Sequence, residues 1–163
     1  MRKPVTITIA AAAAAIAAVT GVAAAGASPA TRAAASGTED MQVMSATAGP
    51  ASVIARGVFT AAGRARLSDA RTATITFPGG TVVLSHRQAH GSQHFYPASC
   101  LSLVSQSGSY QITHGTGRYA GISGHGTYQL SLEMIGARVH GQCSPGRPLA
   151  QQELLRLSGP ARL

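Results

Sequence analysis

The sequence contains no tryptophan, only two cysteines and few acidic residues: five aspartates and glutamates stand against thirteen lysines and arginines among 163 residues. Arg64, Arg66 and Arg71 cluster without interleaved aromatic residues, so nothing there would stack on bases, and we expect no nucleic-acid partner. The two cysteines do not form a C-x-x-C motif, which argues against a dithiol redox site. No motif indicates a cofactor, and none is predicted.

Acidic residues are scarce in the segment that we expect to fold, residues 51–163. It contains only Asp69, Glu133 and Glu153. Glu133 alternates with apolar residues, so we expect it to face solvent. An interior without an acid is poorly placed for carboxylate-assisted chemistry, which favours a protein that is not an enzyme.

Residues 1–27 have the features of a secretory signal peptide. Arg2 and Lys3 precede an apolar stretch that ends near Val22, and small residues follow in an A-x-A register. We predict a signal helix that is cleaved after Ala25 or Ala27, leaving a secreted, extracellular protein without stable membrane insertion. A retained anchor is the alternative, because about 18 apolar residues just span a bilayer. The predicted mature chain has eleven arginines and five acidic residues, a formal charge of +6.

Cys100 and Cys143 form an even pair in a chain that we expect to be exported. Cysteine pairs in oxidising compartments usually bridge, so we predict a structural disulfide. Closing a loop of this length stabilises a fold by roughly 4 kcal/mol in the chain-entropy treatment. Two free thiols are the alternative.

The hydrophobic pattern predicts an all-β fold. Residues 28–50 are rich in Ala, Ser, Thr and Gly and indicate a flexible leader, with a short strand at 41–44 as an option. A single domain then spans 51–163. Its clearest strand is 128–134, where apolar residues alternate with polar ones, and 151–158 is a weaker strand candidate that a helix would also fit. Seven or eight short strands with Gly and Pro between them favour a sandwich or a closed barrel, and barrel closure would remove exposed strand edges.

The most distinctive segment is glycine-rich and runs from Tyr110 to Tyr128. A dinucleotide-binding fingerprint does not fit it, because a strand pattern follows where a helix is required. Glycines there favour a tight corner between two strands, with Tyr119 folded back as a plug at one end of the core.

The strand, G-T-G-x-Y-x-G-x-x-G-x-G, strand pattern of this segment is similar to the glycine-rich hairpin of the allene oxide cyclase and dirigent barrels. With the C-S-P tripeptide at 143–145 and the closing G-P-A-R-L at 159–163, it resembles most closely a family of uncharacterised secreted actinobacterial proteins with that barrel. The resemblance covers residues 53–163. It implies a small antiparallel eight-stranded barrel, calycin-like in architecture, with an interior cavity. No catalytic residue of the cyclases can be matched to a position here.

Candidate site residues are aromatic side chains and histidines. Tyr110, His114, Tyr119 and Tyr128 are the candidates to line the cavity, with His114 expected on the same strand face as Tyr110. A structural role for His114 at the barrel rim is the competing interpretation. Histidines also recur at four-residue intervals, at His86, His90 and His94, and are weak candidates for a metal site. Gly91, Ser92 and a loop expected at 95–97 favour instead a histidine-bearing surface loop.

Three hypotheses for function follow. The first is a secreted, non-catalytic barrel that binds a small apolar ligand or an envelope component. The second is an isomerase-like enzyme of the cyclase or dirigent type, which rests on the barrel resemblance alone. The third is a basic structural exoprotein that adheres to anionic cell-envelope polymers through its positive charge.

Overall fold

The computed structural model describes residues 34–46, 50–68 and 71–163, and omits the side chains of residues 145–147. The chain divides into two units, residues 1–32 and 33–163, and every described residue belongs to the second. The predicted signal peptide, residues 1–27, therefore lies outside the described residues, as does the start of the predicted leader.

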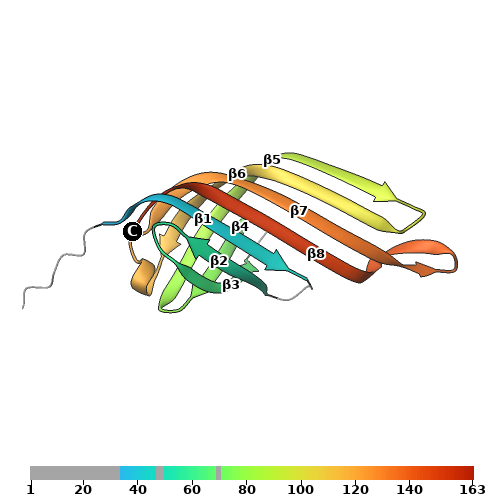
Figure 1. The fold of residues 1–163 in the computed structure, drawn as a ribbon, viewed down its shortest axis with the longest axis horizontal. Coiled ribbons are helices and arrows are strands. Elements are labelled where there is room, and N and C mark those ends of the chain that lie inside the picture. Colours follow the sequence, from blue (N-terminus) through green and yellow to red (C-terminus); the bar gives the residue numbers. More distant parts are fainter. Residues whose placement is uncertain (1–33, 47–49, 69–70) are drawn as a thin grey trace, which may run out of the picture. The chain divides into compact units, whose positions relative to one another are not determined.

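The described chain is an antiparallel barrel of eight strands, which confirms the predicted fold class. Each strand pairs with the next along the chain, and β1 also pairs with β8 to close the barrel (Figure 1). A single 3₁₀ turn, Gly117–Tyr119, connects β6 and β7. The strands are β1 Ser36–Ser45, β2 Ala51–Arg56, β3 Ala61–Leu67, β4 Thr72–Phe77, β5 Gly80–Tyr96, β6 Leu101–Gly115, β7 Ser123–Val139 and β8 Gln142–Arg162.

The first strand corrects the predicted domain boundary. The sequence predicts a flexible leader over residues 28–50 with an optional short strand at 41–44, but residues 36–45 form β1, which is hydrogen-bonded along its length to β8. Met41 and Val43 point into the core and are 2% and 6% exposed. Because β1 closes the barrel, the folded domain begins before residue 51.

The core follows from alternation along the strands, with every second residue directed inward. At one end of the barrel, Phe59, Phe77 and Tyr119 form an aromatic cluster with ring centroids 4.9 to 5.5 Å apart. Tyr119 is 3% exposed, and its hydroxyl donates to the carbonyl of Pro78. This cluster fills the end of the barrel beside the glycine-rich corner, as predicted for Tyr119.

Two interior tyrosines fit because each lies over a glycine on the neighbouring strand. Tyr110 pairs with Gly126, and Tyr128 pairs with Gly108. A Cβ atom at Gly126 would lie 2.8 Å from the Tyr110 ring, and one at Gly108 would lie equally close to the Tyr128 ring. The glycines of the 108–126 region therefore make room for the largest side chains of the core.

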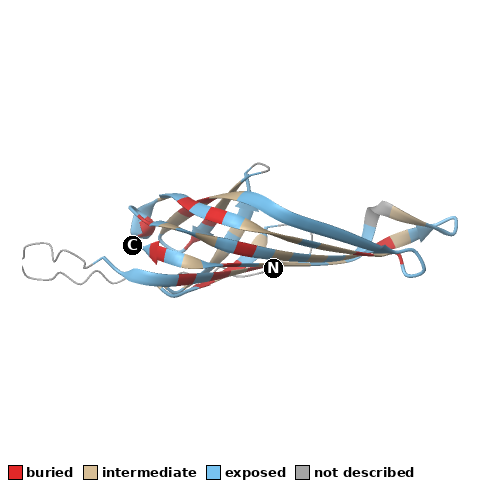
Figure 2. Ribbon diagram, turned by 90° about the horizontal axis from the view of Figure 1, so that it is seen from above, coloured by how far each residue is buried: buried red, intermediate tan, exposed pale blue. Residues whose placement is uncertain are grey.

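The long strands β5–β8 continue past the short strands as an open four-stranded sheet (Figure 1). We call this part, residues 87–104 and 132–152, the extension. No residue of the buried apolar cluster belongs to it, and five of the seven most exposed large apolar side chains do. Figure 2 shows buried residues gathered in the barrel, while the extension is mostly exposed. Barrel closure therefore does not remove the strand edges, contrary to the sequence-based expectation.

The far end of the extension is held by a disulfide between Cys100 and Cys143, which confirms the predicted bridge. It links the turn between β5 and β6 to the start of β8. Beside it, the Arg138 guanidinium donates to the carbonyls of Pro97, Ala98 and Gly141 at 2.8 to 3.2 Å. The bridge indicates folding in a non-reducing environment.

Within the described ranges, no helix is long and apolar enough to span a bilayer.

Candidate functional site

The barrel is filled at one end and hollow at the other. Opposite the aromatic cluster, where β1 ends and β2 begins, a hollow of about 430 Å³ opens between the short strands and β8. We call it the mouth. Its inner wall is apolar, and polar groups sit at its rim. The apolar wall includes Val43, Ala51, Ala65, Ala73, Ile75, Leu84, Leu155 and Leu157, and the polar residues of the lining are Ser45, Arg66, Gln151 and Glu153.

Small side chains create the mouth. The inward positions of β3 are occupied by Ala61, Gly63 and Ala65, and Ala65 lies opposite Ile75 of β4. The Phe77 ring fills the space above Gly63, whereas Ala65, together with Ala51 and Ala73, leaves space that Leu or Ile would fill. A mouth of a β-barrel with an apolar wall and a few polar rim groups is a common type of small-molecule site.

The interior also holds a carboxylate, Glu39, that sequence reasoning missed. Glu39 lies on the inward face of β1, two residues before Met41, and is fully buried. Its Oε2 accepts a hydrogen bond from the Phe59 amide at 3.1 Å, which ties β1 to the loop between β2 and β3. The expectation that the interior lacks an acid is therefore wrong, because it excluded residues 36–45 from the folded domain.

A second buried polar group, the hydroxyl of Tyr110, is close enough for the charge of Glu39 to act on it. Within the described part of the chain, Glu39 Oε1 and Tyr110 Oη have no hydrogen-bond partner. Burial raises the pKa of Glu39, and the Phe59 amide partly opposes that shift. Burial, and then the negative charge of Glu39, raise the pKa of Tyr110 to about 12. Such a pair is costly to bury, and both groups favour their protonated forms.

Glu39 does not belong to the mouth. It contacts the loop beside the aromatic cluster, and Val43, the nearest mouth residue on that strand, lies four positions further along β1. At about 3.3 Å per residue this is roughly 13 Å. An apolar molecule in the mouth would therefore meet alanine, valine and leucine before any acid of the inner core.

The structure places three of the four cavity candidates in the interior and one outside it. Tyr110, Tyr119 and Tyr128 are buried core residues, and burial raises the pKa of Tyr128. His114 is exposed, so the expectation that it shares the inward face of Tyr110 is wrong. A β-bulge at Thr113 shifts the register, leaving His114 opposite the outward residue Val83. None of the three tyrosines lines the mouth, where the open space lies.

The three evenly spaced histidines lie on one strand, β5, and not on a surface loop. A bulge between Gln88 and His90 reverses the side-chain alternation. His86 consequently faces inward, with its ring 5.8 Å from that of Tyr128, whereas His90 and His94 face outward. Among the described residues, no three His, Cys, Asp or Glu side chains gather as a metal site would require.

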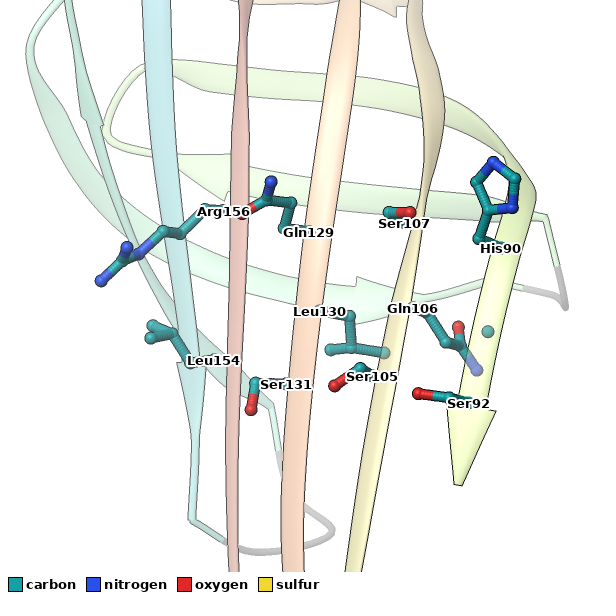
Figure 3. A pocket seen from close by; sticks show the side chains of 11 residues that line it. His90, Ser92, Ser105, Gln106, Ser107, Gln129, Leu130, Ser131, Leu154 and Arg156 are labelled. Carbon is teal, nitrogen blue, oxygen red and sulfur yellow. The ribbon is translucent and has the colours of Figure 1, made fainter. Parts of the chain in front are cut away.

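A second hollow, of about 500 Å³, lies on the outer face of the sheet. Figure 3 shows its side chains arriving from four adjacent strands, with His90 at one end and Arg156 at the other. Serine and glutamine side chains from β6 and β7 lie between them. Leu130 and Leu154 also line this hollow, so its lining is mixed, and His90 and Arg156 are the groups there that can carry positive charge.

No family model, curated protein or solved structure matches this chain.

Proposed function

We propose that this chain is an exported, non-catalytic β-barrel protein that binds a small apolar ligand in the mouth of the barrel. The observation that carries the proposal is the mouth itself, a hollow of about 430 Å³ with an alanine-lined apolar wall in an otherwise packed interior. Hollows of about 300 to 1,000 Å³ are the usual size for small-molecule sites.

Export is the first part of this proposal. The predicted signal peptide at 1–27 and the Cys100–Cys143 bridge both support it, because structural disulfides persist mainly outside the cytoplasm. The resemblance to secreted actinobacterial barrels of the allene oxide cyclase type adds to it by analogy alone.

Ligand carriage fits the mouth better than catalysis does. Proton transfer needs an acid or base within hydrogen-bond reach of the reacting atom. Among the described residues, Glu153 is the single acid in the lining of the mouth, which includes no His, Tyr or Lys to act with it. The buried carboxyl of Glu39 is roughly 13 Å from the nearest mouth residue on its strand. An isomerase of the cyclase type is therefore less well supported than a binding protein.

A second candidate function is adhesion to anionic envelope polymers through the outer face. The outer hollow with Arg156 and His90 at its ends favours this candidate, as does the formal charge of +6 for the predicted mature chain. Binding of that kind weakens with salt because mobile ions screen exposed charges over about 8 Å at physiological ionic strength. Ligand binding in the mouth would be nearly independent of salt.

The neutral fluorescent probe N-phenyl-1-naphthylamine tests the mouth directly. Ala65→Phe places a ring in the mouth, whereas Ala62→Phe places the same ring on the outward face of the same strand. We expect the wild type and Ala62→Phe to enhance probe fluorescence alike, and Ala65→Phe to weaken binding by about tenfold or more, equivalent to about 1.4 kcal/mol. Equal binding by the two variants, or no binding by the wild type, would refute the proposal.

A further inference from the structure

The extension leaves one long strand edge unpaired, and it belongs to β5. The paired register of β4 with β5 ends where Thr72 lies opposite Ser85, and the His86 amide then donates to the Arg71 carbonyl. From Arg87 to Tyr96, β5 pairs only with β6 among the described residues. In Figure 1 this part of β5 forms the border of the sheet. An unpaired edge presents a row of backbone donors and acceptors to any other strand.

This edge lacks the features that usually protect such strands. Its only charged residue is Arg87, at the end nearest the barrel, and it contains no proline. The bulge after Gln88 interrupts its first part, but His90–Tyr96 is a regular strand of seven residues. Phe95 and Tyr96, at its outer end, are 48% and 42% exposed.

The opposite edge of the extension, on β8, is less suited to pairing. It is free only beyond Glu153, where β1 ends at Ser45, and it contains Pro148, which has no amide hydrogen to donate. Pairing of β5 with β8 of another copy joins unlike surfaces, so it would build a ring or an open filament and not a two-fold dimer. Pairing of β5 with β5 joins like surfaces and closes as a dimer.

We propose that two copies of this chain associate through the His90–Tyr96 segments of β5, paired antiparallel about a two-fold axis at Gln93. Direct cross-strand partners in this register share a sheet face and have Cβ atoms about 4.5 to 5.5 Å apart. Gln93 meets its own counterpart, and its side-chain amide carries both a donor and an acceptor for that contact. Ser92 meets His94, and no two like charges are opposed within the segment.

The register also covers both exposed aromatic rings. Phe95 of each copy falls opposite Gly91 of the other on the inner face, and Tyr96 falls opposite His90 on the outer face. A ring over a glycine on the neighbouring strand is the arrangement that this chain already uses twice, for Tyr110 over Gly126 and Tyr128 over Gly108. The space above Gly91 is now occupied by the end of the Gln88 side chain, which is flexible enough to move aside.

The inference goes beyond the proposed function and does not depend on it. The paired edge lies on β5 of the extension, and the only residue of β5 in the mouth is Leu84. Dimer formation and probe binding can therefore be lost independently of each other.

Substitutions at the two-fold axis provide the test. Gln93→Lys would place two ammonium groups side by side in the dimer, and like charges directly opposite destabilise strand pairs. Gln152→Lys is the matched control, because Gln152 is an exposed glutamine of the extension on β8. By sedimentation velocity we expect the wild type and Gln152→Lys to form dimers at about 100 μM, as suits a small interface, and Gln93→Lys to need at least about tenfold more protein.

Cysteine variants test the register itself. Under mild oxidation, we expect Gln93→Cys to yield a covalent dimer on non-reducing gels while Gln152→Cys stays monomeric, because only position 93 meets its own counterpart. A wild type that stays monomeric while Gln93→Cys fails to cross-link would overturn the proposal. Equal cross-linking at both positions would overturn it too, since it would indicate an edge on β8 or non-specific association.

Discussion

The barrel and the extension are built from the same strands and are stabilised in different ways. In the barrel, β5–β8 bury one face against β1–β4, and the apolar cluster fills the interior. In the extension, the same four strands have no opposing sheet within the described residues, and their ends are fastened by the Cys100–Cys143 bridge and by Arg138. Alternation of apolar and polar residues thus predicts a strand, but a core needs a second layer as well.

Both proposed binding sites lie at the boundary between the barrel and the extension or within the extension. The mouth lies where the barrel gives way to the extension, so its wall includes core residues such as Ile75 and half-buried residues such as Leu155. The open edge of β5 exists because β5 is longer than its neighbour β4 and extends beyond it. Both proposed binding surfaces lie where the packing of the barrel stops.

Paired truncations give the largest expected contrast between the two regions. Ile75 is 1% exposed in the barrel, and Leu132 is a half-buried residue of the extension. We expect Ile75→Ala to lower the free energy of unfolding by about 2 to 5 kcal/mol, as for buried aliphatic residues, and Leu132→Ala to lower it by less than about 1.5 kcal/mol. Urea denaturation measures both values, and equal losses would mean that the extension has a core of its own.

Removal of the disulfide is expected to give the second-largest loss in the free energy of unfolding. The double variant Cys100→Ser with Cys143→Ser should lose about 2 to 4 kcal/mol, because the unfolded chain regains the entropy of an open loop of over forty residues. Structure should be lost first in the extension, where the bridge lies. Near-ultraviolet circular dichroism of the buried tyrosines should stay close to that of the wild type at low urea. Simultaneous loss of the tyrosine signal would contradict independent stabilisation of the two regions.

The buried carboxyl of Glu39 gives the smallest of these effects. Because burial raises its folded-state pKa above the unfolded value, the native protein binds the proton more tightly, and stability falls as pH rises through the folded pKa. Glu39→Gln keeps an acceptor for the Phe59 amide and cannot ionise. We expect it to gain about 1 to 2 kcal/mol over the wild type at pH 7 and little at pH 4, measured by urea denaturation.

The opposite pH dependence would contradict this account of Glu39. If the wild type gained stability relative to Glu39→Gln as pH rose from 4 to 7, the ionised carboxylate would have to be stabilised inside the barrel by partners other than the Phe59 amide.

Much of the fold is predictable from alternation and turn residues, since the 128–134 strand, the 151–158 strand and the disulfide all lie where the sequence predicts them. The buried position of Glu39 could also have been predicted, because Glu39, Met41 and Val43 share one face of a strand once residues 36–45 are assigned to the domain. The bulges at Thr113 and after Gln88 could not be predicted, since no residue signature marks them. Each bulge turns a histidine side chain to the opposite face of the sheet from the one that simple alternation gives. The mouth is lined by residues of six strands, β1–β5 and β8, and pairwise patterns do not describe how these strands come together.

Hydrogen exchange of the Gln93→Lys variant, resolved by mass spectrometry of peptides, tests the contrast between barrel and extension most directly. The account predicts that peptides of β1, β2 and β4 exchange only through global unfolding, while peptides from 87–96 exchange many times faster because half of their amides face the free edge. Equally slow exchange in both regions would contradict the account. Every amide of β5 would then be protected to the same degree as the amides of the closed barrel.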